Sequence, residues 1–276
     1  MLGKNEEFSN IFQNNPMCEI IDIEKYVKLE EFATQLYEMR KAKGLTEIEA
    51  KELVKQPTYF AMMLLKNNIA DGVVAGAKYS TADVLRPGLQ IIKTKPDKKV
   101  VTGGMLMLKK GCRPLFFGDV SLIQQPTSEE LADIAVASAE FMEKVVKVEP
   151  QVAMLSFSTK GSAKHEMVDK VRIATEIAKS KSDYAIDGEM QADSALDLAT
   201  SQKKGIASSV GGNANVLIFP DLDAGNIGYK LVARLAGYEA IGPIMLNFKK
   251  PINDLSRGCT IQEIVNTVII TKLLAE

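Results

Sequence analysis

A short polar segment near the end of the chain combines residue types that bind phosphate. Residues 253–260 read NDLSRGCT, which sets the Ser256 hydroxyl next to the Arg257 guanidinium, just before a helix expected to begin near Thr260. Arginine suits phosphate because its planar guanidinium can donate two parallel hydrogen bonds to it. An ion pair between Asp254 and Arg257 in a capped turn fits the same pattern about equally well.

A second segment also places hydroxyl groups beside a cationic side chain. Residues 80–87 read STADVLRP, so that Ser80 and Thr81 stand at an expected helix start and Arg86 follows. Side chains of these types at a helix start can bind an anion. A solvated helix face is equally consistent with this sequence.

A polar, glycine-containing turn follows an apolar segment in the middle of the chain. Residues 151–157, QVAMLSF, are apolar on both faces, as expected of a central parallel strand, and STKGSA follows at 158–163. The turn brings Ser158, Thr159 and Lys160 to the carboxyl end of the strand, where their polar groups can bind an anion. Its spacing matches neither a Walker loop nor a dinucleotide fingerprint, and a helix cap with a solvated lysine explains it as well.

Several other catalytic chemistries lack the residues that they need. His165 is the only histidine, it lies among charged residues, and the chain has no Gly-x-Ser-x-Gly motif, which argues against a serine hydrolase. Cys112 and Cys259 have no histidine partner, so we expect no cysteine nucleophile. The carboxylates of 187–193, DGEMQAD, lack the spacing of a metal-binding loop. The sequence therefore predicts no metal site.

The elements that must position these residues alternate between helical and strand patterns. Such alternation predicts the α/β class, with mainly parallel sheets and helices on both faces. Thr46 and Glu49 form a capping-box pattern at one helix start. The expected helices cover 30–43, 46–53, 127–148, 166–180, 194–202, 226–236 and 261–274, and the expected strands 70–77, 99–108, 114–120, 151–157, 184–187 and 215–219.

Two charged, proline-marked segments predict how the chain divides into lobes. They are TKPDKK at 94–99 and KKP at 249–251. If the last segment packs back against the first, residues 1–98 plus 251–276 form one α/β lobe and residues 99–250 form a second lobe inserted into it. A cleft between two such lobes is a common place for a ligand.

Composition excludes several classes of protein. The 34 Lys and Arg residues nearly balance the 35 Asp and Glu residues, so no global field favours nucleic acid or an anionic membrane. Three widely spaced cysteines suggest a reducing, cytoplasmic setting. The first residues, MLGKNEE, have no apolar core of signal-peptide length, and no apolar run approaches the ~20 residues that cross a bilayer.

Five segments together resemble the phosphate acetyltransferase (phosphotransacetylase) family. They are AKYSTADVLRP at 77–87, MLSFSTKGSA at 154–163, DGEMQ at 187–191, ANVLIFPDLDAGNIGYK at 214–230 and PINDLSRGC at 251–259. The resemblance implies acetyl transfer between coenzyme A and inorganic phosphate in a cleft between two α/β lobes, commonly in a homodimer. It implies acetyl-CoA, phosphate and acetyl phosphate as reactants, and no metal or redox cofactor.

The resemblance also assigns roles to individual residues. It places Ser256 and Arg257 at the reacting centre, where Ser256 would hydrogen-bond the thiol sulfur or the developing oxyanion and Arg257 would hold the phosphate. Glu263 would take the position of the family's aspartate base, with a side chain one methylene longer. The other residues assigned to phosphate or coenzyme A are Arg86, Arg40, Ser80, Thr81, Ser158, Thr159, Lys160, Asn226, Tyr229, Lys230 and Asn253.

Acyl transfer between a thiol and phosphate requires these residue types independently of the resemblance. Acyl transfer between a thiol and phosphate passes through a tetrahedral oxyanion beside a phosphate dianion. Convergent arginines stabilise that charge, and removing one such donor commonly costs ~3–4 kcal/mol. The thiol, with an ordinary pKa of about 8.5, needs a base or a positive field to form thiolate at neutral pH.

Two alternatives stay open at this stage. Propionyl or butyryl transfer would use the same chemistry, because the sequence does not reveal the size of the acyl pocket. A catalytically impaired acyl-CoA-binding or regulatory paralogue is favoured by Glu263 and by the start of the chain, because family members reach the equivalent of Met1 after an earlier segment of roughly fifty residues. The intact Ser256, Arg257 and Arg86 oppose it.

Overall fold

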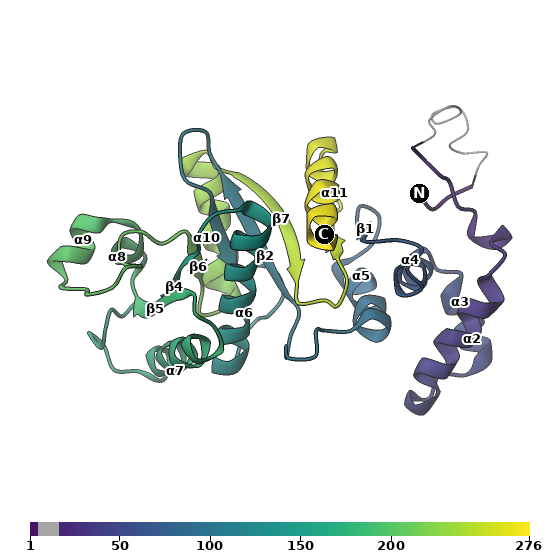
Figure 1. Ribbon diagram of the computed structural model, residues 1–276, viewed down its shortest axis with the longest axis horizontal. Helices are drawn as coiled ribbons and strands as arrows, with labels where there is room; N and C mark the ends of the chain where they lie inside the picture. The colour runs from purple at the N-terminus through teal and green to yellow at the C-terminus, as the bar shows by residue number, and fades with distance from the viewer. Residues whose placement is uncertain (5–16) are drawn as a thin grey trace.

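The larger of two β-sheets has six strands and organises the middle of the chain (Figure 1). The computed structural model describes residues 1–4 and 17–276. The strand order is β5-β4-β6-β3-β2-β7, in which β5, β4, β6 and β3 are parallel and β2 runs antiparallel to β3 and β7. The strands are β2 (Thr102–Leu108), β3 (Leu115–Gly118), β4 (Gln151–Leu155), β5 (Ala185–Met190), β6 (Val216–Ile218) and β7 (Glu239–Leu246).

Helices cover both faces of this sheet, as the alternation predicts. Along β4, Val152 and Met154 face one apolar cluster with α6 (Ser128–Phe141) and α7 (Glu166–Lys181). Ala153 and Leu155 face another cluster, against which α10 (Leu222–Ala236) packs. Because successive side chains of a strand point to opposite faces, a central strand must be apolar at every position. The predicted α/β class and the central position of β4 are confirmed.

The smaller sheet consists of two short parallel strands and lies between the larger sheet and the N-terminal helices (Figure 1). It pairs β1 (Val73–Ala75) with β8 (Ile252–Asp254), which are far apart in the sequence. Both strands contribute to an apolar cluster with α2 (Leu29–Arg40), α3 (Glu47–Val54) and α4 (Pro57–Lys66). The sequence analysis did not identify α4, whose residues are buried nearly all round and therefore lack helical periodicity.

Helix ends explain most differences from the predicted ranges. The capping box of Thr46 and Glu49 is present, and Asp197 interrupts the predicted helix 194–202 by capping a second helix. The predicted helix 127–148 ends as an α-helix at Phe141 and continues as a π turn. The remaining elements are η1 (Ile23–Lys25), η2 (Lys41–Lys43), α5 (Thr81–Pro87), η3 (Gly88–Ile92), η4 (Met142–Val146), α8 (Ala192–Leu196), α9 (Leu198–Lys203) and α11 (Ile261–Ala275).

Two segments connect the sheets, and they pair with each other. The backbone N–H of Lys95 donates to the carbonyl of Asn247 at 2.9 Å, and the N–H of Lys249 donates to Lys93 at 3.0 Å. The division into residues 1–98 plus 251–276 and residues 99–250 stays a prediction. Among the helices of the described residues, none has both the length and the apolar character to cross a membrane.

Candidate active site

The turn that carries Ser256 and Arg257 lies at the carboxyl edge of the smaller sheet. Because β1 and β8 are parallel, the segments that follow them start at the same edge, where ligands of α/β sheets commonly bind. The Thr81 hydroxyl, at the start of α5, donates to Oδ2 of Asp254 at 2.6 Å. The structure therefore brings the Ser80–Thr81 segment next to the Ser256–Arg257 turn.

The alternative ion pair between Asp254 and Arg257 is wrong. Oδ2 of Asp254 accepts its bond from Thr81 instead, and Arg257 is exposed, with no ion-pair partner among the described residues. Ser256 is exposed as well. Both side chains are thus open to a ligand.

Asp254 is a buried carboxylate directly before this turn. Only 3% of its surface is exposed, and its Oδ1 has no hydrogen-bond partner among the described residues. Burial raises the pKa of Asp254, and the hydrogen bond from Thr81 acts in the opposite direction. The charge of Asp254 is therefore costly to the fold at neutral pH.

We expect Asp254→Asn to gain stability relative to the parent chain as the pH rises from 4 to 7. Between the ordinary carboxyl pKa of 3.8 and the raised folded value, the folded parent binds more protons than the unfolded chain, so its free energy of unfolding falls with pH. The amide of the variant cannot ionise, so the free energy of unfolding of the variant does not fall with pH for this reason. Urea unfolding at several pH values measures the difference.

Asp197→Asn is the matched control with the opposite sign. The hydrogen bond from the Thr200 hydroxyl lowers the pKa of the exposed Asp197, so this variant should lose stability relative to the parent as the pH rises. Equal pH dependence of the two variants would contradict the assignment for Asp254.

Tyr59, in α4, is a phenol whose ionisation both Arg40 and Arg86 influence. Burial raises the pKa of the Tyr59 phenol, and the positive charges of Arg86 and Arg40 lower it by less. The Tyr59 hydroxyl donates to Oε1 of Gln90 at 3.0 Å. The charges of both predicted arginines therefore act on Tyr59, a residue that the sequence analysis did not single out because it is distant from them in the sequence.

Glu263 lies in the first turn of α11, close after the Ser256–Arg257 turn. Its Oε2 accepts hydrogen bonds from the backbone N–H of Thr260 at 2.6 Å and from the Thr260 hydroxyl at 3.0 Å. This capping box fixes the start of α11, near where the sequence places it. The role of Glu263 as a base stays a prediction, and the structure adds a capping role.

The turn after β4 is bound to the neighbouring strand β5. Ser158 is fully buried, and its hydroxyl donates to Oε1 of Glu189 at 2.9 Å. Lys160 forms an ion pair with Asp187 at 2.6 Å. Ser158 is therefore held within the protein in this conformation, and its contact with substrate stays a prediction.

Thr159 shares the same arrangement, because its hydroxyl oxygen accepts the backbone N–H of Gln191 at 3.0 Å. This turn is held mainly by contacts within the protein. Of its three predicted residues, only Lys160 is exposed.

Three predicted residues, Asn226, Tyr229 and Lys230, lie in α10. Nδ2 of Asn226 donates to the Val120 carbonyl at 3.0 Å, in a loop whose Leu122 packs against the apolar cluster of the smaller sheet. Burial raises the pKa of Tyr229, and Lys230 is exposed. The start of α10 is thus linked through this loop to the part of the molecule that carries the arginines.

Asn253 has a structural role in this fold, and its contact with substrate stays a prediction. It is fully buried; its Oδ1 accepts the Met245 N–H at 2.8 Å, and its Nδ2 donates to the Thr271 hydroxyl at 2.8 Å. Asn253 therefore ties together β7, β8 and α11.

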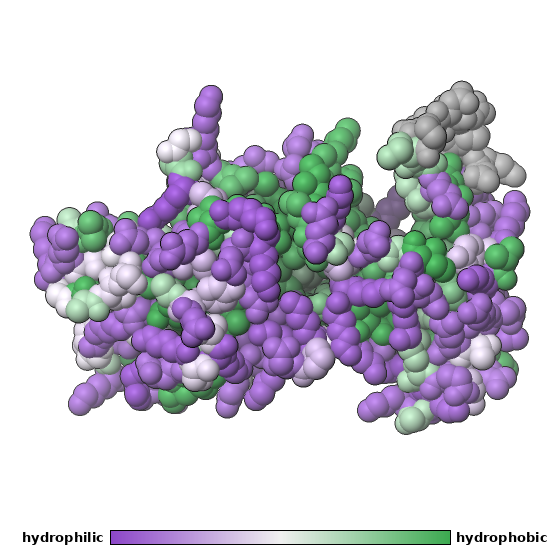
Figure 2. Space-filling model, viewed as in Figure 1, coloured by the Kyte–Doolittle hydropathy of each residue, from purple (hydrophilic) through white to green (hydrophobic). Residues whose placement is uncertain are grey.

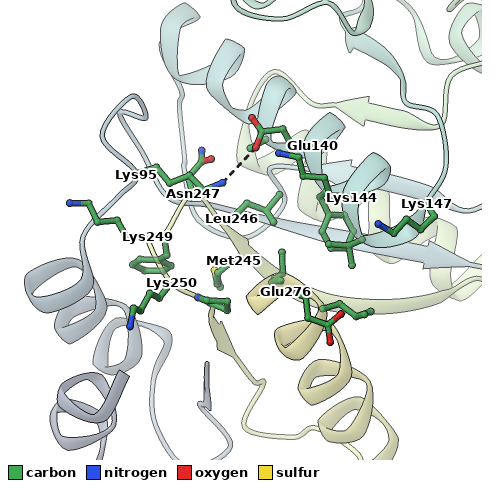
Figure 3. Close-up of a pocket in the computed structure, with 17 residues that line it drawn as sticks. Lys95, Glu140, Lys144, Lys147, Met245, Leu246, Asn247, Lys249, Lys250 and Glu276 are labelled. Carbon is green, nitrogen blue, oxygen red and sulfur yellow. Dashed lines mark ion pairs between the residues drawn. The ribbon is translucent and has the colours of Figure 1, made fainter. Parts of the chain in front are cut away.

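Two cavities lie elsewhere. A cavity of about 440 Å³ opens beside the two connecting segments, with Lys95 paired to Glu140 at 3.6 Å on one side and Glu276 on the other (Figure 3). A second, of about 590 Å³, lies between β1 and α11. Among the described residues, none of the predicted site residues lines either cavity, so an interlobe cleft as the active site stays a prediction.

Comparisons with known proteins agree with the resemblance. A family model described as "Phosphate acetyl/butaryl transferase" matches residues 2–272. A phosphate acetyltransferase of Clostridium acetobutylicum is 52% identical, over 98% of this chain and 83% of its own. A solved phosphotransacetylase of Streptococcus pyogenes is 43% identical with a TM-score of 0.93, over 99% of this chain and 84% of its own.

A solved EutD phosphotransacetylase of Staphylococcus aureus is 40% identical with a TM-score of 0.92, over 100% of this chain and 85% of its own. These proteins are therefore similar to the chain both in fold and in amino-acid sequence, over nearly its whole length. The chain therefore belongs to the phosphate acetyl/butaryl transferase family.

Proposed function

We propose that this protein is a phosphate acetyltransferase, which interconverts acetyl-CoA plus phosphate and acetyl phosphate plus coenzyme A. The observation that carries the proposal is the exposed Ser256–Arg257 turn, held at the carboxyl edge of the smaller sheet beside the Ser80–Thr81 segment. Similar proteins over nearly the whole chain carry the name phosphate acetyltransferase, which supports acetyl as the group transferred.

The transfer takes place directly between the two substrates. The coenzyme A sulfur attacks the carbonyl carbon of acetyl phosphate, a C–S bond forms, and the C–O bond to phosphate breaks after a tetrahedral oxyanion. The Ser256 hydroxyl donates to that oxyanion, and Arg257 binds the phosphate as its negative charge grows. Arg86 and Arg40 add positive charge on the phosphate side.

The thiol proton needs an acceptor as the C–S bond forms. We assign the role of acceptor to Glu263, which follows Arg257 in the sequence and lies in the first turn of α11. Its capping bonds hold the carboxylate at this place, and one oxygen, Oε1, has no hydrogen bond among the described residues. Oε1 is therefore the atom that we expect to take the proton.

Coenzyme A is expected to contact the exposed groups at the larger sheet. Lys230 offers an exposed ammonium group for its phosphates, and Tyr229 offers a partly buried ring. Lys160 is exposed too, and it would bind a phosphate in exchange for its ion pair with Asp187. Coenzyme A enters as a substrate and the arginines supply positive charge, so the proposed reaction needs no resident cofactor. Three free cysteines, Cys18, Cys112 and Cys259, support a reducing, cytoplasmic location.

We also propose that two copies form a homodimer through exposed apolar faces of α10 and α11. On α10, Ile227, Leu231 and Leu235 are 57%, 52% and 82% exposed and recur every four residues. On α11, Ile261, Val265 and Val268 are 83%, 45% and 50% exposed, and Figure 2 shows hydrophobic surface gathered on and around this helix. Apolar surface of this extent is typical of an interface.

Leu231→Glu or Val268→Glu is expected to raise the dissociation constant of the dimer at least about tenfold, because the new carboxylate would be buried in an apolar interface. Light scattering over a concentration series measures the association. Ile48→Glu, at a 77% exposed site on α3, is the control that should leave it unchanged. A parent chain that is monomeric at all concentrations would refute the dimer.

Reaction rates with two acyl phosphates measure the acyl specificity. Acetyl phosphate should give a kcat/KM at least about tenfold above that of butyryl phosphate, since a pocket shaped for acetyl must distort to admit two more methylenes. A preference for butyryl phosphate would refute the acetyl assignment while leaving the reaction type intact.

A further inference from the structure

The turn that carries Ser256 and Arg257 is attached to its surroundings by two hydrogen bonds from distant segments. The Leu255 N–H donates to the Ala75 carbonyl at 2.7 Å, which extends the pairing of β1 and β8 by one residue. The Thr81 hydroxyl donates to Asp254 at 2.6 Å, across 173 residues of sequence. The second bond is the only side-chain bond, among the described residues, that joins α5 to β8.

Asp254 is placed to hold this turn rather than to touch a substrate. With 3% of its surface exposed, its carboxylate is not accessible to acetyl phosphate or coenzyme A. A buried, ionised carboxylate is costly unless it gains a strong partner, and Thr81 is the one side chain among the described residues that donates to it. The Thr81 hydroxyl is therefore the side-chain group that fixes the position of this carboxylate relative to α5.

The other end of the bond belongs to a short, well-capped helix that leads to a second predicted functional group. The Ser80 hydroxyl caps α5 by accepting the Asp83 N–H at 3.2 Å, and the Asp83 carboxylate accepts the Ser80 hydroxyl at 2.6 Å. Arg86 lies further along the same helix. A rigid start of α5 thus fixes Arg86 relative to Thr81, and Thr81 in turn is fixed relative to Asp254.

We propose that the Thr81–Asp254 hydrogen bond is a positioning contact, which holds the Ser256–Arg257 turn in register with α5 and Arg86. The proposal rests on the proposed acetyl transfer and deepens it. Without the bond, the turn opens more often and Arg257 loses its fixed position relative to α5, which carries Arg86. Displacements of about 1 Å between reacting groups commonly cost about 100-fold in rate. Thr81 and Asp254 are positioning residues, and the groups that they position are Ser256, Arg257 and Arg86.

Two readouts distinguish this contact from direct binding of substrate by Thr81. Thr81→Val, which removes the hydroxyl but keeps the side-chain volume, should lower kcat about tenfold and leave the KM for coenzyme A within about twofold. It should also raise the rate of tryptic cleavage after the exposed Arg257 about tenfold, because cleavage needs the turn to open. Mass spectrometry follows the cleavage as release of the fragment 258–276.

Conservative and control variants complete the experiment. Thr81→Ser keeps the donor and should lose much less kcat than Thr81→Val. In an Asp254→Ala background, Thr81→Val should add little further loss, because the bond is already gone. Thr34→Val removes an exposed hydroxyl that donates to its own helix at 3.0 Å, and should change neither kcat nor cleavage.

An unchanged cleavage rate in Thr81→Val would overturn the proposal, and so would additive losses in the double variant. A raised KM with unchanged kcat and cleavage would identify Thr81 as a direct substrate contact instead. If the parent chain has no transferase activity, the proposed function fails, but the cleavage comparison still decides whether the bond holds the turn.

Discussion

Arg257→Ala is expected to lower kcat/KM for acetyl phosphate and coenzyme A by about 10²–10³-fold, with little change in melting temperature. Arg257 is exposed and makes no ion pair among the described residues, so the fold loses little when the side chain is removed. The proposed transition state loses the guanidinium that offsets the growing phosphate charge. Initial rates of thioester formation at matched protein concentration measure the effect.

Arg172→Ala is the matched control for this prediction. Arg172 is also an exposed arginine, paired with Asp169 at 2.9 Å one turn away on α7, far from the smaller sheet. Its loss should change the rate by less than about twofold. Equal losses in the two variants would mean a general effect of charge on the substrates and would contradict a specific role for Arg257.

Gly76→Ala is expected to have the largest effect on the fold around the site. Gly76 adopts φ +116, and a Cβ atom there would lie closer than van der Waals contact allows to Oδ1 of Asp254 and to the backbone of Leu255. The backbone of the Ser256–Arg257 turn would have to move. We expect a loss of about 3 kcal/mol or more in the free energy of unfolding, and activity near background even where the variant folds.

Gly44→Ala separates the clash from the strain of the backbone conformation. Gly44 also adopts a positive φ, +88, but a Cβ atom there would meet no neighbour within 4 Å. This variant should lose only about 1–2 kcal/mol and keep its activity. Urea unfolding and activity assays on both variants test the comparison, and similar behaviour of the two would contradict the packing at Gly76.

Local sequence signals predicted those elements whose ends are decided by neighbouring residues. The capping box of Thr46 and Glu49 depends on residues three positions apart and is present, and α6 begins directly after Thr127, at the start of the expected range. The strand β4 was predictable because it is buried on both faces. In contrast, β7 and β8 were not identified, because the pairing partners that make them strands lie far away in the sequence.

The sequence names candidate residues for the site but does not show what each of them contacts. The Ser256–Arg257 turn is exposed as a ligand-binding turn must be, whereas Ser158 and Asn253 are fully buried in hydrogen bonds within the protein. A sequence motif does not show whether a polar side chain faces a ligand or satisfies a buried partner. The bond between Thr81 and Asp254 spans 173 residues, and no local pattern predicts it.

The most direct test of the account is to measure, in one reaction, the acetyl-CoA formed and the phosphate released by the purified chain from acetyl phosphate and coenzyme A. The account predicts equal amounts of both products and near-complete loss of both in Ser256→Ala and Arg257→Ala. Release of phosphate without thioester would indicate hydrolysis. A folded chain that binds coenzyme A and forms neither product would contradict the assignment as an acetyltransferase.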